Sequence, residues 1–162
     1  FVPASFVKKA LKNLVLSAIA ILTLVFIGTS CSSDDNNSSE IIIQASELPI
    51  KAKTFLDNVF TNIDITRVEK ETKSVDEYYE VYLTGGIHID FNQAGEWTEV
   101  DGNNQANPTG FINPNIVTYV TTNYSATAIE SIDKKAYGFD VDLLNNIELR
   151  FDFEGNFLGT GN

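Results

Sequence analysis

The sequence predicts an α+β fold built as a tandem repeat of two units, each a helix followed by a four-stranded antiparallel sheet. Three observations support this prediction: two runs with helical spacing of apolar residues, strand-like alternation after each run, and near-constant offsets that superimpose the two halves. These apolar periods are the main sequence signal for helices and strands. We expect the domain to span residues 46–162, with repeat one at 46–102 and repeat two at 110–160.

Each predicted unit begins with a helix that has one apolar face. In the first unit this face comprises Leu48, Ala52, Phe55, Leu56, Val59 and Phe60. Adding 64 to these numbers gives a second run that is apolar except at Asn123, namely Ile112, Ile116, Tyr119, Val120, Asn123 and Tyr124. Pro49 and Pro114 stand near the start of the runs, where a helix tolerates proline. The same offset relates Ile65 to Ile129, which indicates a strand after each helix.

The remaining strands are predicted from alternation and from a second offset of 60. This offset carries Val81, Leu83, Ile87, Phe91 and Gly95 to identical residues at 141, 143, 147, 151 and 155. All apolar residues face one core only if Leu83 lies opposite Ile87 and Phe91 lies opposite Trp97. A slip of one residue would turn every core residue outward, so the register is strongly specified. We therefore expect four aromatic side chains to be buried: Phe91, Trp97, Phe151 and Phe157.

The hairpin loops agree with this register. A three-residue loop needs a left-handed conformation at its third position, and glycine or asparagine accepts it most readily. Gly86 and Asn146 occupy this position in the two predicted units. In each unit the helix is expected to cover the apolar face of its own sheet.

The first thirty residues predict a lipoprotein signal peptide. They contain three lysines and no acidic residue, and an apolar stretch follows from Leu14 to Ile27. A basic start, a short apolar run and small residues at its end are typical of a secretory signal. This run is short for a permanent transmembrane helix, which needs about 20 apolar residues.

Cys31 is the only cysteine and stands where the signal ends. The segment Gly28-Thr29-Ser30-Cys31 resembles a lipobox, with Gly28 in place of the usual leucine. The resemblance implies acylation of Cys31 and membrane attachment, because two or more acyl chains anchor a protein stably. Residues 31–45 are expected to form a disordered acidic tether. The expected location is the outer membrane, on its periplasmic side or at the cell surface.

The charge of the exported chain restricts its partners. Removing residues 1–30 takes away three lysines and no acidic residue, which lowers the formal net charge from −11 to −14. Such a chain repels the phosphates of nucleic acids, so no nucleic-acid partner is expected.

The sequence offers no recognisable catalytic residues. His88 is the only histidine, and the only cysteine is assigned to the lipid. A nucleophile needs an adjacent base, and a metal site on His88 would need further His or Cys ligands, which the sequence lacks. We therefore predict no catalytic residue, no metal site and no cofactor. His88 is expected to point to solvent, opposite Tyr82.

The predicted outward face of the sheet is more informative. The register places Glu80 opposite Asp90 and Asp142 opposite Glu148, although like charges at such positions are destabilising. Four interpretations stay open: solvated surface, a site for a basic partner, a cation site with oxygen ligands, or acid–base chemistry. The candidate partner-binding face comprises Tyr78, Glu80, Tyr82, His88, Asp90, Asp140, Asp142 and Glu148.

One strand motif resembles a known family. The segment Leu83–Trp97, with its Gly85-Gly86 pair, and the Leu48-Pro49 step before the first helix resemble the PepSY-like, beta-lactamase-inhibitor-like lipoprotein family. The resemblance covers roughly residues 46–160 and implies a non-enzymatic, protein-binding role that includes inhibition. The second copy lacks the Gly-Gly pair and has Phe157 in place of the tryptophan. We expect an envelope protein with a basic surface as the partner. The alternative is an envelope sensor or a periplasmic protein that binds a ligand or cation.

Overall fold

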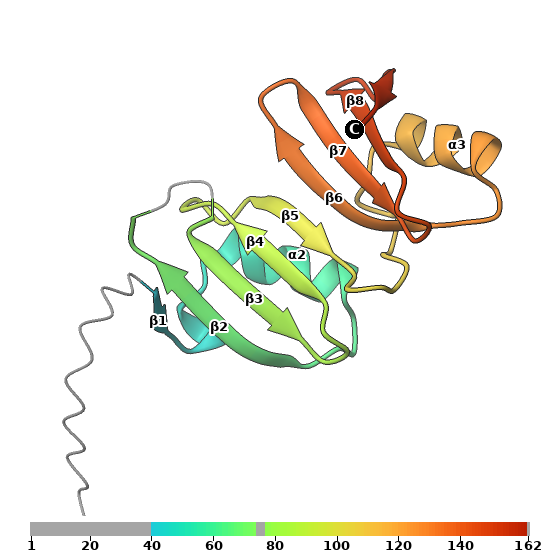
Figure 1. Ribbon diagram of the computed structural model, residues 1–162. Coiled ribbons are helices and arrows are strands. Elements are labelled where there is room, and N and C mark those ends of the chain that lie inside the picture. The colour runs from blue at the N-terminus through green and yellow to red at the C-terminus, as the bar shows by residue number, and fades with distance from the viewer. Residues whose placement is uncertain (1–39, 74–76, 162) are drawn as a thin grey trace, which may run out of the picture. The chain divides into compact units, whose positions relative to one another are not determined.

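The computed structural model describes residues 40–73 and 77–161, which contain one antiparallel sheet of nine strands (Figure 1). Each strand pairs with the next one along the chain, so the spatial order is β1 to β9 without a crossover. The strands are β1 (Glu40–Ile42), β2 (Ile65–Glu71), β3 (Tyr79–Leu83), β4 (His88–Phe91), β5 (Trp97–Asp101), β6 (Ile129–Lys135), β7 (Gly138–Leu143), β8 (Glu148–Asp152) and β9 (Phe157–Thr160).

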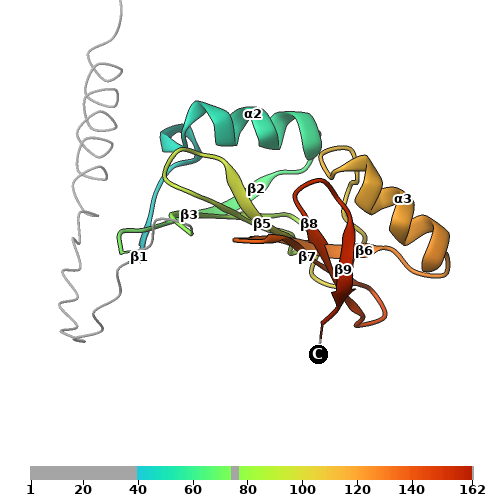
Figure 2. The same ribbon diagram turned by 90° about the horizontal axis from the view of Figure 1, so that it is seen from above.

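Two α-helices lie on the same side of this sheet (Figure 2). A 3-10 turn, η1 (Ala45–Glu47), leads into α2 (Ile50–Val59), and α3 spans Pro114–Asn123. Pro49 directly precedes α2 and Pro114 opens α3, where the missing proline N–H would have no helical partner. The side chain of Asn113 caps α3 by accepting a hydrogen bond from the backbone N–H of Asn115. Both predicted helices are confirmed.

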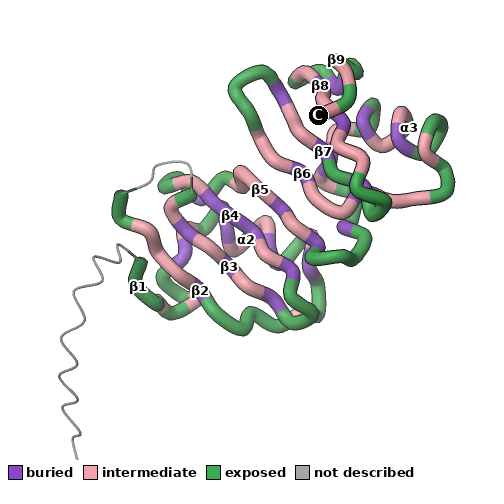
Figure 3. The backbone as a smooth tube through the Cα atoms, viewed as in Figure 1, coloured by how far each residue is buried: buried purple, intermediate pink, exposed green. Residues whose placement is uncertain are grey.

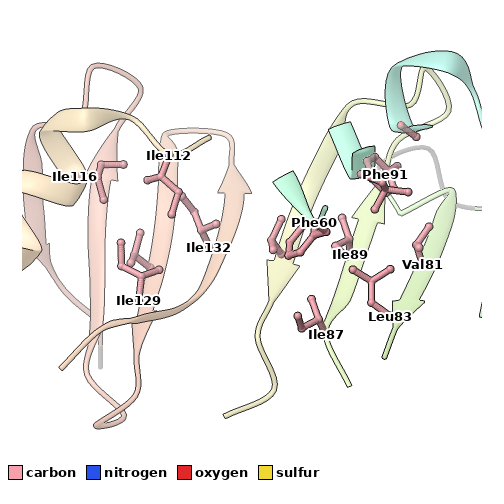
Figure 4. Close-up of a cluster of buried hydrophobic side chains, with 14 of the residues drawn as sticks. Phe60, Val81, Leu83, Ile87, Ile89, Phe91, Ile112, Ile116, Ile129 and Ile132 are labelled. Atoms are coloured by element: carbon pink, nitrogen blue, oxygen red, sulfur yellow. The ribbon is translucent and has the colours of Figure 1, made fainter. Parts of the chain in front are cut away.

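The core lies between these helices and the sheet. Every strand from β2 to β8 contributes a buried apolar residue to one lateral row, namely Val68, Val81, Ile89, Val100, Ile132, Val141 and Leu149. Both helices place their buried residues against this face, and Figure 4 shows side chains from the regions of both helices. The burial pattern alternates along the strands (Figure 3), and within residues 40–73 and 77–161 no helix covers the opposite face. This second face is where the candidate residues lie.

The predicted register is confirmed within each half of the sheet. The N–H of Leu83 donates to the carbonyl oxygen of Ile87 at 2.9 Å, and Phe91 pairs with Trp97. Gly86 and Asn146 have left-handed φ angles of 88° and 63°, as their loop positions require.

The predicted fold class of two separate helix-plus-four-strand units is wrong. The strands form one open nine-stranded sheet in which β5 pairs with β6, the first strand after α3. Val100 on β5 and Ile132 on β6 are partners in this pairing, and both are buried. The physical reason is that an unpaired strand edge exposes a row of backbone donors and acceptors. Pairing β5 with β6 satisfies both edges at once, whereas alternation along each strand says nothing of this junction.

Asn107 reinforces the junction between β5 and β6. Its buried side-chain amide donates to the carbonyl oxygens of Val100 on β5 and Glu130 on β6. Glu130 lies where the register between β6 and β7 shifts. Its backbone N–H donates to the carbonyl oxygen of Ile129 at 2.9 Å. The linker between the two halves therefore contributes to the same sheet.

The burial prediction for the four aromatic residues is only partly right. Phe91 and Phe151 are completely buried, but Trp97 is half-buried and Phe157 is 37% exposed. Phe157 lies on β9, the last strand of the sheet, so one side of its ring lacks a neighbouring strand. Its other side stacks on Tyr119 of α3, with ring centroids 4.5 Å apart.

The predicted signal peptide and Cys31 lie outside the described residues. Part of the expected tether is ordered, because Glu40–Ile42 form β1 and pair with β2. The apolar Ile41 and Ile42 and the backbone pairing with β2 favour a strand there over the expected disorder. Among residues 40–73 and 77–161, no helix has the length and apolar character needed to cross a membrane.

Candidate functional site

The helix-free face of the sheet contains a lateral row of carboxylates. Residues that are direct partners across strands project from the same face, with Cβ atoms about 4.5–5.5 Å apart. Each strand from β2 to β7 contributes one acidic side chain at successive partner positions. We call this set the carboxylate row: Glu69, Glu80, Asp90, Glu99, Asp133 and Asp140. Arg150 on β8 is the partner of Asp140 and ends the row.

A second row on the same face lies two residues away along each strand. It runs Arg67, Tyr82, His88, Asp101, Ser131, Asp142 and Glu148. The hydroxyl group of Ser131 donates to the carboxylate of Asp142 at 2.9 Å. The two rows together make one mainly acidic surface.

Basic groups lie at intervals along this surface. Arg67 is 3.5 Å from the carboxylate of Glu69, and Lys135 forms an ion pair with Asp133. Arg150 lies 3.0 Å from Glu148 and 3.7 Å from Asp140. These groups offset part of the repulsion at both ends of the carboxylate row, whereas its middle has a different environment.

Glu99 occupies that middle position, and the pKa of its carboxyl group is strongly raised. Burial, followed by the charges of Asp90 and Asp133, raises the pKa of Glu99 to about 7, although His88 partly opposes this shift. Near neutral pH the Glu99 carboxyl is therefore protonated in a large fraction of molecules. A protonated carboxyl there relieves the repulsion between its two acidic neighbours.

This pKa gives a stability prediction. Because the pKa of Glu99 is about 7 in the folded protein and 4.5 ordinarily, its contribution to stability is complete below about pH 4.5. That contribution is lost as pH rises through about 7. We expect Glu99→Gln, which imitates the protonated acid, to raise the urea midpoint at about pH 8 and to change it little near pH 4.5. Urea unfolding in the presence of a chelator, followed by fluorescence of the single tryptophan, measures this difference. An equal change at both pH values would contradict the assignment.

His88 lies against two carboxylates of the row. Its Nε2 atom is 2.9 Å from Oδ1 of Asp90 and 3.6 Å from Oε2 of Glu80. Burial lowers the pKa of His88, but the close approach of Asp90 and the charges of Glu80 and Glu99 outweigh it, so the net shift is upward. His88 lies on the helix-free face and pairs with Tyr82, as predicted, but it is less solvated than expected, because only a quarter of its side chain is exposed.

Tyr82 contacts both His88 and Glu80 and so fixes their positions. Its ring stacks on His88 with centroids 4.7 Å apart, and its hydroxyl group donates to Oε2 of Glu80 at 2.8 Å. The guanidinium group of Arg67 lies over the ring of Tyr82, 4.0 Å from its centroid. Burial and the Glu80 carboxylate raise the pKa of Tyr82 to about 12, so the hydroxyl group stays a hydrogen-bond donor.

The structure brings most of the predicted candidate residues onto one face. Glu80 is the partner of Asp90, and Asp142 is the partner of Glu148, as the register predicted. Tyr78 is the exception, because it precedes β3 and packs beside Tyr79 and the core, with ring centroids 4.9 Å apart. Sequence reasoning missed acidic residues near the junction and the outer edge, namely Glu69, Glu99, Asp101 and Asp133.

A depression of about 720 Å³ lies over the second row. Its polar lining includes Glu99, Asp101, Ser131, Asp142 and Glu148. Leu143 and Ile147 add a small apolar part. The acidic surface is thus hollowed between β5 and β8 and offers carboxylates to an approaching group.

The fold is that of an α+β protein in which helices cover one face of an antiparallel sheet. The other face is open to solvent and mainly acidic. Residues 77–159 match the model of the PepSY-like family, which is described as beta-lactamase-inhibitor-like. The chain belongs to this family. A comparison with curated proteins found no match.

Three solved structures from Bacteroides are similar to the chain. The first, from Bacteroides thetaiotaomicron, is described as a candidate calcium-regulated periplasmic protein; it is 30% identical, with a TM-score of 0.71 over 76% of this chain and 97% of that one. A candidate periplasmic protein from Bacteroides vulgatus is 31% identical, with a TM-score of 0.70 over 80% and 99%. Another from the same species is 28% identical, with a TM-score of 0.70 over 76% and 99%. These likenesses support export to the periplasm.

Proposed function

We propose that this chain is an exported envelope lipoprotein that binds another protein through the acidic, helix-free face of its sheet. The observation that carries the proposal is the carboxylate row, in which β2 to β7 each contribute one acidic partner. Like charges at directly opposite positions reduce the stability of a sheet. Retaining them across adjacent strands favours a role for the surface beyond folding.

The chemistry of the face favours a partner rich in lysine or arginine. Its carboxylates would pair with such groups, and the stacked Tyr82 adds the kind of aromatic side chain that is enriched in interfaces. The family description, beta-lactamase-inhibitor-like, is consistent with binding rather than catalysis. Inhibition of the partner is part of the proposal, and the absence of enzymatic activity stays a prediction.

Photo-crosslinking in cells identifies the partner and tests the face. A crosslinker at Ser131 on the acidic face should capture an envelope protein, whereas one at the exposed Thr118 on α3 should not. Equal capture of the same protein from both positions would contradict the proposed face.

The purified partner then allows a kinetic test. Electrostatic steering raises association rates and is screened within about 8 Å at physiological salt. We expect association to slow as salt rises, and Glu80→Lys with Asp142→Lys to lower the rate by about tenfold or more. The matched control is Asp57→Lys with Glu154→Lys, which makes the same charge change at exposed positions away from the face. If both double variants associate equally fast, the acidic face is not the binding surface.

A second candidate function is cation sensing. The relative from Bacteroides thetaiotaomicron is described as a candidate calcium-regulated protein, and calcium prefers six to eight oxygen ligands. In this chain the carboxylate row would supply such oxygens. Repeating the association measurement with and without calcium separates the two candidates, because a sensor requires the cation to change the rate.

A further inference from the structure

We infer that Glu80, His88 and Asp90 form a binding site for a transition-metal dication of the zinc type. The three side chains come from two paired strands: Glu80 is on β3, and His88 and Asp90 share one face of β4. One ligand atom from each lies within 4.8 Å of the others. The inference does not depend on the proposed partner, since it concerns the isolated chain.

The distances suit a shared ion. Nε2 of His88 lies 2.9 Å from Oδ1 of Asp90 and 3.6 Å from Oε2 of Glu80. Zinc bonds to histidine nitrogen and carboxylate oxygen are about 2.0–2.2 Å long. Two ligands on one ion are therefore about 3.0–3.5 Å apart at angles between about 90° and 110°. The two separations from Nε2 bracket this range, and the ligand atoms of Glu80 and Asp90 lie within 4.8 Å of each other, so side-chain adjustments bring all three onto one ion.

Two of the three ligand atoms are buried and contact each other. Nε2 of His88 and Oδ1 of Asp90 are inaccessible to solvent, and apart from their own 2.9 Å approach neither has a hydrogen-bond partner among the described residues. Asp90 as a whole is only 5% exposed. Such buried polar atoms are costly unless something satisfies them. An approach of 2.9 Å between these two atoms requires either a proton that they share or a metal ion bound to both.

The surroundings favour a metal ion in two ways. Tyr82 orients both the His88 ring, by stacking, and the Glu80 carboxylate, through its hydroxyl group. Such outer contacts fix the ligands of metal sites and tune their affinity. Asp101 on β5 is the partner of His88 and adds a carboxylate beside the site.

The donor set selects the class of metal. Imidazole nitrogen with two carboxylates suits zinc and neighbouring transition metals. Calcium prefers oxygen ligands, whereas one of the three ligands here is the imidazole nitrogen of His88. The remaining coordination positions would be filled by water or by a group from a partner.

The single histidine makes the test direct. The full chain is labelled with ¹⁵N-histidine, carries Cys31→Ser so that no thiol competes, and is purified without a histidine tag. We expect zinc chloride to shift the Nε2 resonance of His88 and to saturate at one ion per chain. Calcium chloride should leave this resonance in place. An unchanged resonance under excess zinc would overturn the site and assign the pair to a proton-held ion pair.

Variants distinguish a defined site from diffuse attraction by the acidic face. His88→Gln, Asp90→Asn and Glu80→Gln should each weaken zinc binding by about tenfold or more in calorimetry. The matched control Asp142→Asn removes a carboxylate of the same face outside the triad, and should keep the affinity within about twofold. If the control weakens binding as much as Asp90→Asn, the triad is not the site. Fluorescence of Trp97 checks folding, and the wild-type resonance remains decisive if a variant fails to fold.

Discussion

Truncating Phe91 to alanine is expected to destabilise the domain by about 3–5 kcal/mol. Phe91 is completely buried on β4, and its ring meets that of Phe55 edge-on with centroids 5.8 Å apart. Removing the ring leaves a cavity between α2 and the sheet that the surrounding side chains fill only partly. Because a small domain has about 5–15 kcal/mol of stability in total, this loss is large.

The matched variant is Phe157→Ala on β9. Phe157 is 37% exposed, so its removal loses less buried area and opens a cavity toward solvent. We expect a cost of about 1–2 kcal/mol, below the roughly 3–5 kcal/mol for truncating a fully buried ring. Urea unfolding followed by Trp97 fluorescence measures both changes, provided that the denaturant slope is the same. Equal destabilisation by the two variants would mean that β9 is packed as tightly as β4.

This difference between Phe91 and Phe157 shows where sequence reasoning succeeds and where it fails. Alternation predicted the partner of each residue inside a hairpin, including Glu80 with Asp90. It treated Phe157 as equivalent to Trp97 because the offset relates them. The two environments differ, since Trp97 is on a central strand and Phe157 is on the last one. Position in a sheet is a tertiary property that one strand does not encode.

The junction between β5 and β6 explains the main error in the fold and the main omission in the site. Local alternation fixes which face Glu99 and Asp133 occupy but does not say that β5 and β6 are neighbours. Their pairing merges the two predicted sheets and makes Glu99 the partner of both Asp90 and Asp133. The raised pKa of Glu99 results from this arrangement, together with burial. A short stretch of sequence around either strand does not reveal this pairing, because β5 and β6 are separated along the chain by α3 and its flanking loops.

The metal site that we infer was not predicted from the sequence for a related reason. The sequence argument required further histidines or cysteines near His88, and it considered the carboxylates as a cation site of oxygen ligands alone, without His88. Asp90, two residues along β4, and Glu80, across the hairpin, were both already placed on the face of His88. What the sequence could not show is that Nε2 and Oδ1 are buried and have no hydrogen-bond partner except each other, since burial depends on the packing of Tyr82 and the flanking strands.

Replacing Cys31 is expected to abolish membrane attachment completely. The chain has one cysteine, so no other thiol is available for thioether formation with a lipid. Stable anchoring needs about two acyl chains, and all of them are proposed to be attached through residue 31. We expect Cys31→Ala to incorporate no labelled palmitate and to move the protein from the membrane fraction to the soluble one.

Cys31→Ser provides the sharper version of this experiment. Serine keeps the size and polarity of the residue and so preserves the signal around it, but its hydroxyl group is a far weaker nucleophile than a thiolate. Loss of label in Cys31→Ser, together with full labelling of the neighbouring Ser32→Ala, attributes attachment to the thiol itself. Continued labelling of Cys31→Ser would show that the chain reaches the membrane without a lipid on this residue. The acidic face of the sheet would then be held near its envelope partner by a different form of membrane attachment.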